Sequence, residues 1–445
     1  MNRRELLKWM SLAGGAAAAP GWAWSMSEVE APAHRLIVLF LRGGADGLAL
    51  CPPLGESAYF DLRPTLASSE SQALPLDSFF GFHPAAGSLK TLFDAGEISV
   101  VHASGLTTAE RSHFEAQAIM EQGIDASDLA IGDGWLGRYM AMLNGGSPLA
   151  AVALNAAVPL SMAGLDSALA LGQIDRFSLR LDARSRMVLE SLYGLDPLLS
   201  PTARAVFEAA DSLVPAQSEA PGPDYPAGPL GVALGDAARL IKAGSGLHAA
   251  AINTGGWDTH EGQLEDLDGL IGELGDALLA FRNDLGSEWH KTTVLVQTEF
   301  GRRVAENASG GTDHGHGGVM LLAGGQVQGG QVLGDWPGLH ASALSDGQDL
   351  AVTTDYRQVI AEILADRFGV SDFAPIFGSW QPGPWQGLFR SSGTDALTSS
   401  WLGKSSPMPG ARPDRWYAPD RLDLRGLGRL RALGYSPAGR LSPTD

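Results

Sequence analysis

The sequence predicts an α/β protein with a doubly wound, mostly parallel sheet flanked by helices. Short apolar runs rich in β-branched residues recur along the chain, and segments with helical spacing of apolar residues separate them. Strands that are buried on both faces have this unbroken apolar character in parallel sheets. The chain has 445 residues, of which 44% are hydrophobic and 18% charged, so it can bury a large core.

The amino-terminal part of the expected domain alternates strand and helix twice. RLIVLFL (35–41) predicts a buried strand, because apolar residues run without a break until Gly43 follows. The helix-like segment 88–97 leads into a second buried strand, ISVVHASG (98–105), and helical spacing then predicts a helix over 109–123. The expected inward-facing side chains of that helix are Phe114, Ala118 and Met120.

The middle of the chain, residues 145–231, is less regular. Helical spacing predicts helices at 182–194 and near 202–214. The stretch 214–231 is rich in proline and glycine, which predicts a loop or the connection to a lid. We expect this middle part to be an insertion that caps the sheet.

Regular alternation returns after the middle part. The expected strands are 247–253, 292–298 and 318–325, and the expected helices are 232–244, 262–285 and 353–369. From residue 391 onward Pro, Ser, Gly and Arg dominate, which predicts a loosely ordered tail (391–445) with room for a short helix at 424–433.

The amino terminus has the features of an export signal. Arg3 and Arg4 open a cationic segment, an apolar run rich in alanine and glycine follows, and small residues up to Ser25 offer a cleavage site. The pattern predicts a signal peptide over 1–25 and a linker over 26–34. It indicates export in the folded state by the twin-arginine machinery, to the periplasm or another extracytoplasmic place. A short amphipathic helix of the folded protein is the alternative.

The charge balance and the single cysteine exclude several functions. The formal net charge is −19, whereas nucleic acids and anionic membranes need basic patches. After the signal, no stretch is apolar over the roughly 18 residues of a membrane span. Cys51 is the one cysteine, which excludes an internal disulfide and a cysteine-based zinc site. A small anionic substrate stays compatible, because a local metal ion outweighs a distant field.

Polar side chains follow the predicted strands at the points where the strands end. Ligands of open α/β sheets bind outside the carboxyl ends of the strands, which meet at one edge if the strands are parallel. The loop GGTDHGHGG (310–318) lies immediately before the last of these strands and adds two histidines. The candidate residues are Asp46, Thr107, Thr108, Ser112, His113, Asp258, His260, Glu299, Arg302, His314 and His316.

The clustering of carboxylates and imidazoles predicts a divalent metal ion. Such groups would repel or desolvate one another in a cleft, and a cation removes that cost. Mixed oxygen and nitrogen ligands suit Zn²⁺, Mn²⁺ or Fe better than Ca²⁺. The expected ligands are Asp46, Asp258, His260, Glu299, His314 and His316. The i, i+2 spacing of the last two points them to opposite sides, so we expect one to bind metal and the other to contact the substrate or support the ligands.

Each segment also has an ordinary structural interpretation. RGGADG with Asp46 could be a strand exit turn, and Asp258 could cap the following helix. Glu299 could be a solvated carboxylate, and Ser112 with His113 could simply open a helix. The agreement among several strand ends favours a site more than any single motif does.

Six motifs together resemble the exported bacterial family catalogued as domain of unknown function 1501. They are LFLRGGADGL (39–48), RSHFEAQ (111–117), NTGGWDTHEGQ (253–263), QTEFGRR (297–303), GGTDHGHGG (310–318) and TTDYRQVIAEIL (353–364). The resemblance spans about 35–390. That family in turn resembles the alkaline phosphatase superfamily, of which it looks like a distant branch. The superfamily includes sulfatases, phosphodiesterases and cofactor-independent phosphoglycerate mutases. The resemblance implies an alkaline phosphatase-like domain over 35–390.

The resemblance also implies roles for individual residues. Asp46 would match the first metal-binding Asp of that superfamily, Asp258 and His260 its Asp/His pair, and His314 or His316 its late His. Two departures stand out: Glu299 and Phe300 replace a usual Asp-His, and the spacing of the Asp258/His260 pair is short. One imidazole ligand is thus missing, which favours a one-metal site or a remodelled two-metal site.

These observations predict an exported, metal-dependent, hydrolase-like protein that acts on a phosphate or sulfate ester. Ser112 would be the nucleophile or a contact to the substrate, with Thr107 and Thr108 as alternatives. His113 would be an acid/base or a ligand, and Arg302 would clamp the anion.

Two other functions stay open. Phe300 and the ambiguous nucleophile suggest a catalytically degenerate binding or assembly protein on the same fold. A metal-dependent redox enzyme is a third hypothesis, prompted only by the export route.

Overall fold

The computed structural model describes residues 32–125, 132–143, 147–179, 181–195, 200–222 and 224–390 of the chain. The expected signal peptide, most of the expected linker and the expected tail with its short helix lie outside the described residues. Among the described residues, no helix is long and apolar enough to cross a membrane.

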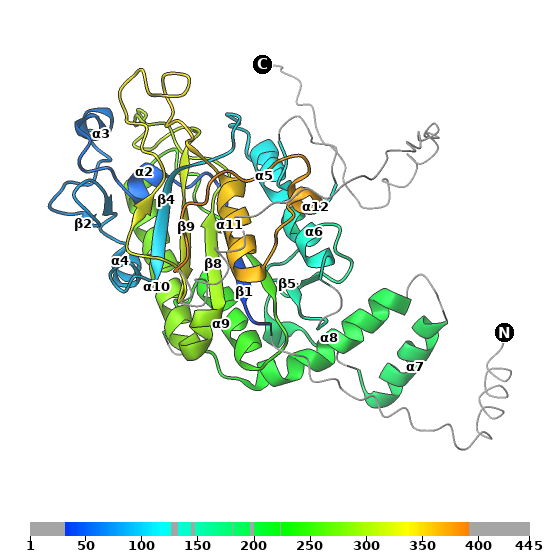
Figure 1. Ribbon diagram of the computed structural model, residues 1–445. Coiled ribbons are helices and arrows are strands. Elements are labelled where there is room, and N and C mark those ends of the chain that lie inside the picture. The colour runs from blue at the N-terminus through cyan, green and yellow to red at the C-terminus, as the bar shows by residue number, and fades with distance from the viewer. Residues whose placement is uncertain are drawn as a thin grey trace, which may run out of the picture. The chain divides into compact units, whose positions relative to one another are not determined.

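One nine-stranded sheet forms the centre of the described domain, with β1 in its interior between β7 and β8 (Figure 1). Its order is β10-β4-β9-β8-β1-β7-β5-β6, and β11 pairs with β4. The strands are β1 (Arg35–Leu41), β4 (Ile98–Gly105), β5 (Ala151–Ala153), β6 (Leu169–Ala170), β7 (Ala249–Thr254), β8 (Thr292–Gln297), β9 (Gly318–Gly324), β10 (Val332–Leu333) and β11 (Thr354–Asp355). A separate antiparallel hairpin joins β2 (Leu74–Pro75) and β3 (Gly81–Phe82).

The sheet is mostly parallel, as predicted, and β9 is the exception. β9 runs antiparallel to both of its neighbours, β4 and β8, while β1 runs parallel to β7 and β8. An antiparallel strand begins at the edge where its neighbours end. The loop before β9 therefore reaches the same edge as the loops that follow β1, β7 and β8.

Helices cover both faces of the sheet, which confirms the predicted α/β class (Figure 1). Residues 37, 39 and 41 of β1 belong to one core and residues 36, 38 and 40 to the other. The first core includes α4 (Gly87–Asp94), α9 (Pro229–Lys242) and α10 (Gln263–Leu285). The second includes α5 (His113–Gln122), α6 (Trp135–Ala141), α11 (Tyr356–Phe368) and α12 (Ala374–Phe377). Short helices complete the domain: α2 (Gly47–Leu50), α3 (Ser57–Leu62), η3 (Leu160–Met162), η4 (Ile174–Arg176) and η5 (Gly286–Lys291).

The inward orientation predicted for Phe114 is wrong. Helix α5 begins at His113 rather than at 109, and Phe114 in its first turn is 88% exposed. Ala116, Ile119 and Met120 form the buried side, at the three- and four-residue spacing of one helix face.

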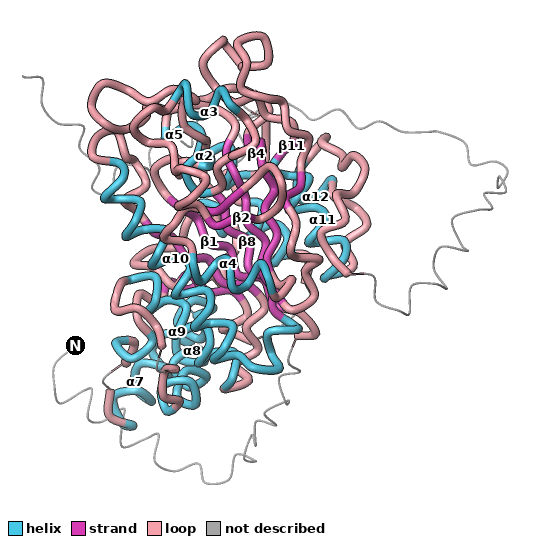
Figure 2. The backbone as a smooth tube through the Cα atoms, turned by 90° about the vertical axis from the view of Figure 1, so that its left-hand side faces the viewer, coloured by secondary structure: helices cyan, strands magenta, loops and turns pink. Residues whose placement is uncertain are grey.

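The middle part of the chain does more than cap the sheet. β5 pairs with β7 and β6 pairs with β5, so this part extends one edge of the sheet. It continues into α7 (Ala183–Gly194) and α8 (Ser200–Ser218), and α8 runs past the predicted helix end through Pro215. In Figures 1 and 2, α7 lies at the end of these helices that is farther from the sheet.

A buried ion pair holds the loop after β1. Oδ1 of Asp46 accepts hydrogen bonds from the N–H groups of Leu48 and Ala49 at 3.1 and 3.2 Å, which caps α2. Oδ2 accepts from Arg63 Nη1 and Gln263 Nε2, each at 2.6 Å. The side chains of Asp46 and Arg63 are both 0% exposed. Protein donors thus hold both oxygens of this carboxylate.

Replacement of Arg63 should destabilise the fold strongly. Arg63→Met leaves the Asp46 carboxylate buried without its cation, which we expect to lower the free energy of unfolding by about 3–5 kcal/mol. Urea denaturation followed by circular dichroism measures this change. Lys90→Met removes only the surface ion pair with Asp94, and its expected cost is below about 1 kcal/mol. Equal effects of the two substitutions would contradict the prediction.

Candidate metal centre

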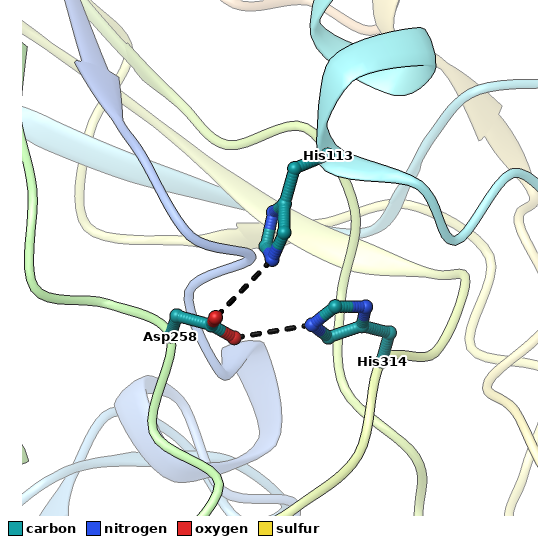
Figure 3. Close-up of side chains that lie close together, drawn as sticks. All are labelled: His113, Asp258 and His314. Atoms are coloured by element: carbon teal, nitrogen blue, oxygen red, sulfur yellow. Dashed lines mark hydrogen bonds and ion pairs between the residues drawn. The ribbon is translucent and has the colours of Figure 1, made fainter. Parts of the chain in front are cut away.

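The loops at the carboxyl edge of the sheet bring three side chains together (Figure 3). His113 extends from the start of α5, Asp258 follows β7, and His314 comes from the loop before β9. His113 Nε2 lies 3.3 Å from Asp258 Oδ2, and His314 Nε2 lies 3.1 Å from Asp258 Oδ1. Tetrahedral Zn²⁺ with bonds of about 2.0–2.1 Å holds neighbouring ligand atoms roughly 3.3 Å apart, which matches this spacing.

His260 brings a third imidazole to the same carboxylate. Its Nε2 lies 2.9 Å from His314 Nε2 and 3.1 Å from Asp258 Oδ1. Three ring nitrogens, from His113, His260 and His314, therefore surround the Asp258 carboxylate. We call these four residues the His/Asp cluster.

An oxygen acceptor anchors the far nitrogen of each imidazole. These anchoring contacts are His113 Nδ1 to Glu299 Oε1 (2.8 Å), His314 Nδ1 to the Arg111 carbonyl (2.8 Å) and His260 Nδ1 to Asp313 Oδ1 (3.4 Å). A carbonyl or carboxylate oxygen can only accept, so each neutral imidazole carries its proton on Nδ1. Each Nε2 then presents a lone pair toward Asp258.

This arrangement of lone pairs fits a cation. His113 Nε2 is buried and, within the described part of the chain, makes no hydrogen bond. The Nε2 atoms of His260 and His314 face each other at 2.9 Å, where two lone pairs repel unless a proton or metal ion lies between them. A buried acceptor without a donor is costly, and a metal ion would remove that cost for His113 and the repulsion between the other two nitrogens. The ligand atoms of His113, His314 and Asp258 all lie within 4.8 Å of one another, and this set of two imidazoles and one carboxylate suits Zn²⁺, Mn²⁺ or Fe.

Asp258 remains ionised to low pH. Burial raises the pKa of its carboxyl group, but the hydrogen bond from Arg302 and the neighbouring imidazole of His314 outweigh burial and bring the pKa to about 2. The cluster therefore keeps an anionic oxygen ligand throughout the neutral range.

Arg302 is buried, and its N–H groups are occupied by the protein. Its guanidinium donates to Asp258 Oδ1 at 2.6 Å and to several main-chain carbonyls. The carbonyls belong to Gly43, Gly44 (2.6 Å), Trp257 (3.1 Å) and Thr312 (2.8 Å). The role of anion clamp expected for Arg302 is not retained, because no donor points to open space. Instead, Arg302 fixes Asp258 and three loops.

Glu299 is a buried carboxylate that holds His113 in its orientation. Its side chain is 0% exposed, and Oε1 accepts from His113 Nδ1, Gly43 N at 2.9 Å and Gln117 Nε2 at 2.7 Å. Burial raises the pKa of Glu299, but these hydrogen bonds, led by Gln117, lower it on balance. We therefore assign Glu299 to the orientation of His113 rather than to the ligand role that its sequence position suggested.

The remaining candidates lie around the cluster rather than in it. Asp46 is held by Arg63 and Gln263, so its expected ligand role is not retained. His316 is buried and donates from Nε2 to the Leu106 carbonyl at 2.8 Å, so it and His314 have different partners. Ser112 caps α5 next to His113 and, among the described residues, its hydroxyl makes no capping hydrogen bond. Thr107 and Thr108 are exposed in the loop after β4.

Glycines let the loop 310–318 approach its neighbours closely. A Cβ atom on Gly311 would lie 2.3 Å from the His260 carbonyl oxygen, and one on Gly315 would lie 2.4 Å from the Arg302 carbonyl carbon. An isolated β-bridge between Arg302 and His314 fixes the same loop. Side chains at these glycines would push His314 away from Asp258.

Two supporting residues were missed in the sequence. Arg111 orients His314 through its carbonyl, and Gln117 donates to Glu299. Both lie in RSHFEAQ, the motif that supplied Ser112 and His113. Their position inside that motif was the available signal.

The fold and the cluster define an α/β protein with a candidate metal centre at the carboxyl edge of its sheet. The sequence profile of the family described as "Protein of unknown function (DUF1501)" matches residues 99–376. The chain belongs to this family. A comparison with curated proteins found no match.

The matches among solved structures include three bacterial proteins. The C-terminal periplasmic domain of EcEptC from Escherichia coli, in complex with Zn, is 7% identical, with 65% of this chain and 73% of that chain covered and a TM-score of 0.30. The lipoteichoic acid synthase LtaP from Listeria monocytogenes is 10% identical (73% and 75% covered, TM-score 0.32). The phosphonate monoester hydrolase of Agrobacterium radiobacter is 12% identical (79% and 78% covered, TM-score 0.34). The roles of the site residues rest on the geometry above.

The ionisation of Asp258 predicts a specific acid dependence of stability. Its pKa in the folded protein, about 2, is below the ordinary value of 3.8, so its contribution is present above pH 3.8 and is lost as the pH falls toward 2. In the metal-free protein, the stability advantage of wild type over Asp258→Asn should therefore shrink between about pH 4 and pH 2.

Urea denaturation at several pH values in the presence of EDTA tests this dependence. Asp276→Asn, an exposed carboxylate on α10, controls for the loss of one negative charge. A difference between wild type and Asp258→Asn that stays constant across this pH range would refute the assignment.

Proposed function

We propose that this protein is a metal-dependent, hydrolase-like enzyme that acts outside the cytoplasm on small phosphate or sulfate esters, after export by the twin-arginine route. The observation that carries the proposal is the His/Asp cluster. Three imidazoles with anchored Nδ1 atoms turn their Nε2 atoms toward one ionised carboxylate.

The charge of the cluster favours an anionic substrate. Asp258 contributes one negative charge and the adjacent Arg302 one positive charge, at 2.6 Å. Glu299 and Asp313, which contact two of the imidazoles, add two negative charges, and Arg303 near Asp313 adds one positive charge. With neutral imidazoles the site therefore carries about −1, and a bound divalent ion would leave it at about +1 in a chain of net charge −19. Zn²⁺, Mn²⁺ or Fe would supply a Lewis acid that polarises the ester and lowers the pKa of a nucleophile.

The residues around the metal position have separable tasks. His113, His314 and Asp258 would hold the ion, with His260 next to His314, while Glu299 and the Arg111 carbonyl fix the orientation of two imidazoles. Ser112 is our candidate nucleophile, because it adjoins His113 and lies at the amino terminus of α5, where the helix dipole stabilises developing negative charge. Thr107 and Thr108 are the alternatives.

Loss of one imidazole should remove the metal. In the purified mature protein we expect His314→Gln to lower metal affinity by at least about 10–100-fold and to abolish metal-stimulated turnover. Elemental analysis and titration with Zn²⁺ or Mn²⁺ measure the affinity. Hydrolysis of a panel of phosphate and sulfate esters measures the activity.

His340→Gln is the matched control for this experiment, because His340 is exposed and lies outside the cluster. It should keep the metal content of wild type. Wild-type protein that binds none of these metals, and whose turnover none of them stimulates on any ester, would exclude the proposed function.

A binding or assembly protein is the second candidate, and Phe300 favours it. The ring centroid of Phe300 lies 4.9 Å from that of His113 and 4.8 Å from that of His314, and the side chain is buried. An apolar ring therefore occupies space beside the cluster where a second metal would need polar ligands.

Ser112→Ala separates the two candidates. If the protein is a hydrolase that uses Ser112, turnover should fall by about 100-fold or more while metal content and thermal stability stay unchanged. Ser57→Ala, at the exposed start of α3, is the control and should keep wild-type turnover. Metal-loaded Ser112→Ala protein with full turnover would eliminate Ser112 as nucleophile. Absence of turnover in wild type, together with full genetic complementation by Ser112→Ala, would favour the binding protein.

A further inference from the structure

Helix α7 exposes a stripe of large apolar side chains. Within the described residues, this 12-residue helix buries none of its side chains. Met187 is 66% exposed, Val188 48%, Leu192 58% and the C-cap residue Leu195 81%. Single exposed apolar residues are common on protein surfaces, but a continuous stripe of them marks a contact surface.

The opposite side of α7 is already engaged, so the stripe is not free to turn inward. Arg186 forms an ion pair with Asp211 of α8, with Nη1 and Nη2 at 2.5 and 2.6 Å from the two carboxylate oxygens. Its guanidinium also lies over the Phe207 ring, 5.4 Å from the centroid. These contacts set the rotation of α7 against α8 and leave the apolar stripe facing outward.

The stripe is complementary to itself. Met187, Ser191 and Leu195 are spaced four residues apart, which places them along one helix face with the small residue in the middle. If the α7 helices of two copies of the chain pack side by side in antiparallel directions, Met187 of one copy lies against Leu195 of the other. The two Ser191 residues then meet at the two-fold axis, where their small side chains let the helices approach closely. A two-fold interface uses the same surface on both copies, as this pattern requires.

The charge distribution also favours a second copy of this chain. The whole chain carries −19, so two copies repel each other over most of their surface. With its N-cap Asp182, α7 carries Arg184, Arg186 and Glu190, a net charge of 2 − 2 = 0, so it lacks the acidity of the rest of the chain. Figures 1 and 2 both show α7 at an end of the described domain, away from the sheet. Contact through α7 would therefore bring the two acidic domains together only at one end, and salt screens the repulsion between their more distant parts. An anionic membrane would still repel this chain, and Arg184 is a single cation beside the stripe.

We propose that the stripe formed by Met187, Val188, Ser191, Leu192 and Leu195 is the interface of a two-fold symmetric homodimer. This inference is independent of the proposed function, because it concerns a surface outside the His/Asp cluster and needs no metal.

A single introduced thiol tests the symmetry. Cys51 is fully buried, so Ser191→Cys places the one accessible thiol at the expected two-fold axis. Oxidation of the mature protein by O₂ with copper–phenanthroline should give a covalent dimer on a non-reducing gel. Ser218→Cys, exposed at the end of α8, is the matched control and should remain monomeric.

Sedimentation equilibrium tests the interface energetically. Wild type should be dimeric, and the double variant Met187→Glu/Leu195→Glu should weaken dimerisation by about 100-fold. Its circular dichroism and melting temperature as a monomer should not change, because both side chains are exposed in one copy. Met142→Glu changes another exposed methionine and should leave the dimer intact.

Three results would overturn the proposal. The first is a wild type that stays monomeric at its highest soluble concentration. The second is a dimer that the double variant Met187→Glu/Leu195→Glu leaves intact. The third is a monomeric wild type that in addition co-sediments with phosphatidylglycerol vesicles. The last would assign the stripe to a membrane surface instead.

Discussion

The buried guanidinium of Arg302 sets the geometry on which the candidate site depends. A guanidinium that is buried away from water needs protein acceptors for its N–H groups. Here the acceptors are Asp258 and four main-chain carbonyls. These carbonyls belong to the loop after β1, the loop after β7 and the loop before β9. The three loops must therefore keep one mutual arrangement, or the charge is left unpaired. The same arrangement holds His260 and His314 beside Asp258, with both imidazoles already oriented before any ligand arrives.

The direction of β9 is the second requirement. His314 precedes its strand, whereas Asp258, His260 and Glu299 follow theirs. Because β9 is antiparallel to β4 and β8, the residues before it reach the carboxyl edge of the other strands. An all-parallel sheet, as expected from the sequence, would not bring a loop that precedes its strand to this edge. Hydrophobic runs do not record strand direction, since a strand buried on both faces has the same apolar pattern in either orientation.

Periodicity predicted the long elements well and the short ones poorly. Strands β1 and β4 begin and end at the expected residues, and the helices over 263–285 and 356–368 lie within the expected ranges. Strands β5 and β6, at one end of the sheet, have three and two residues, too few to show a pattern, so the middle part was expected to be a cap. Phe114 was misplaced because each residue turns the helix by about 100°, which sets Phe114 on the side of α5 opposite to Ala116, Ile119 and Met120.

The sequence by itself determined the α/β class, the order of the elements and the collection of acidic, imidazole and guanidinium side chains at the strand ends. Tertiary structure alone decided what each of these side chains does. Asp46, Asp258 and Glu299 are equivalent as sequence signals, yet Asp46 is neutralised by Arg63, Glu299 orients His113, and Asp258 faces three imidazole nitrogens. The difference lies in partners such as Gln263 for Asp46 and Gln117 for Glu299, which are 217 and 182 residues away in the chain. Whether a carboxylate is free to bind a metal depends on its burial and its hydrogen-bond donors, and local sequence contains neither.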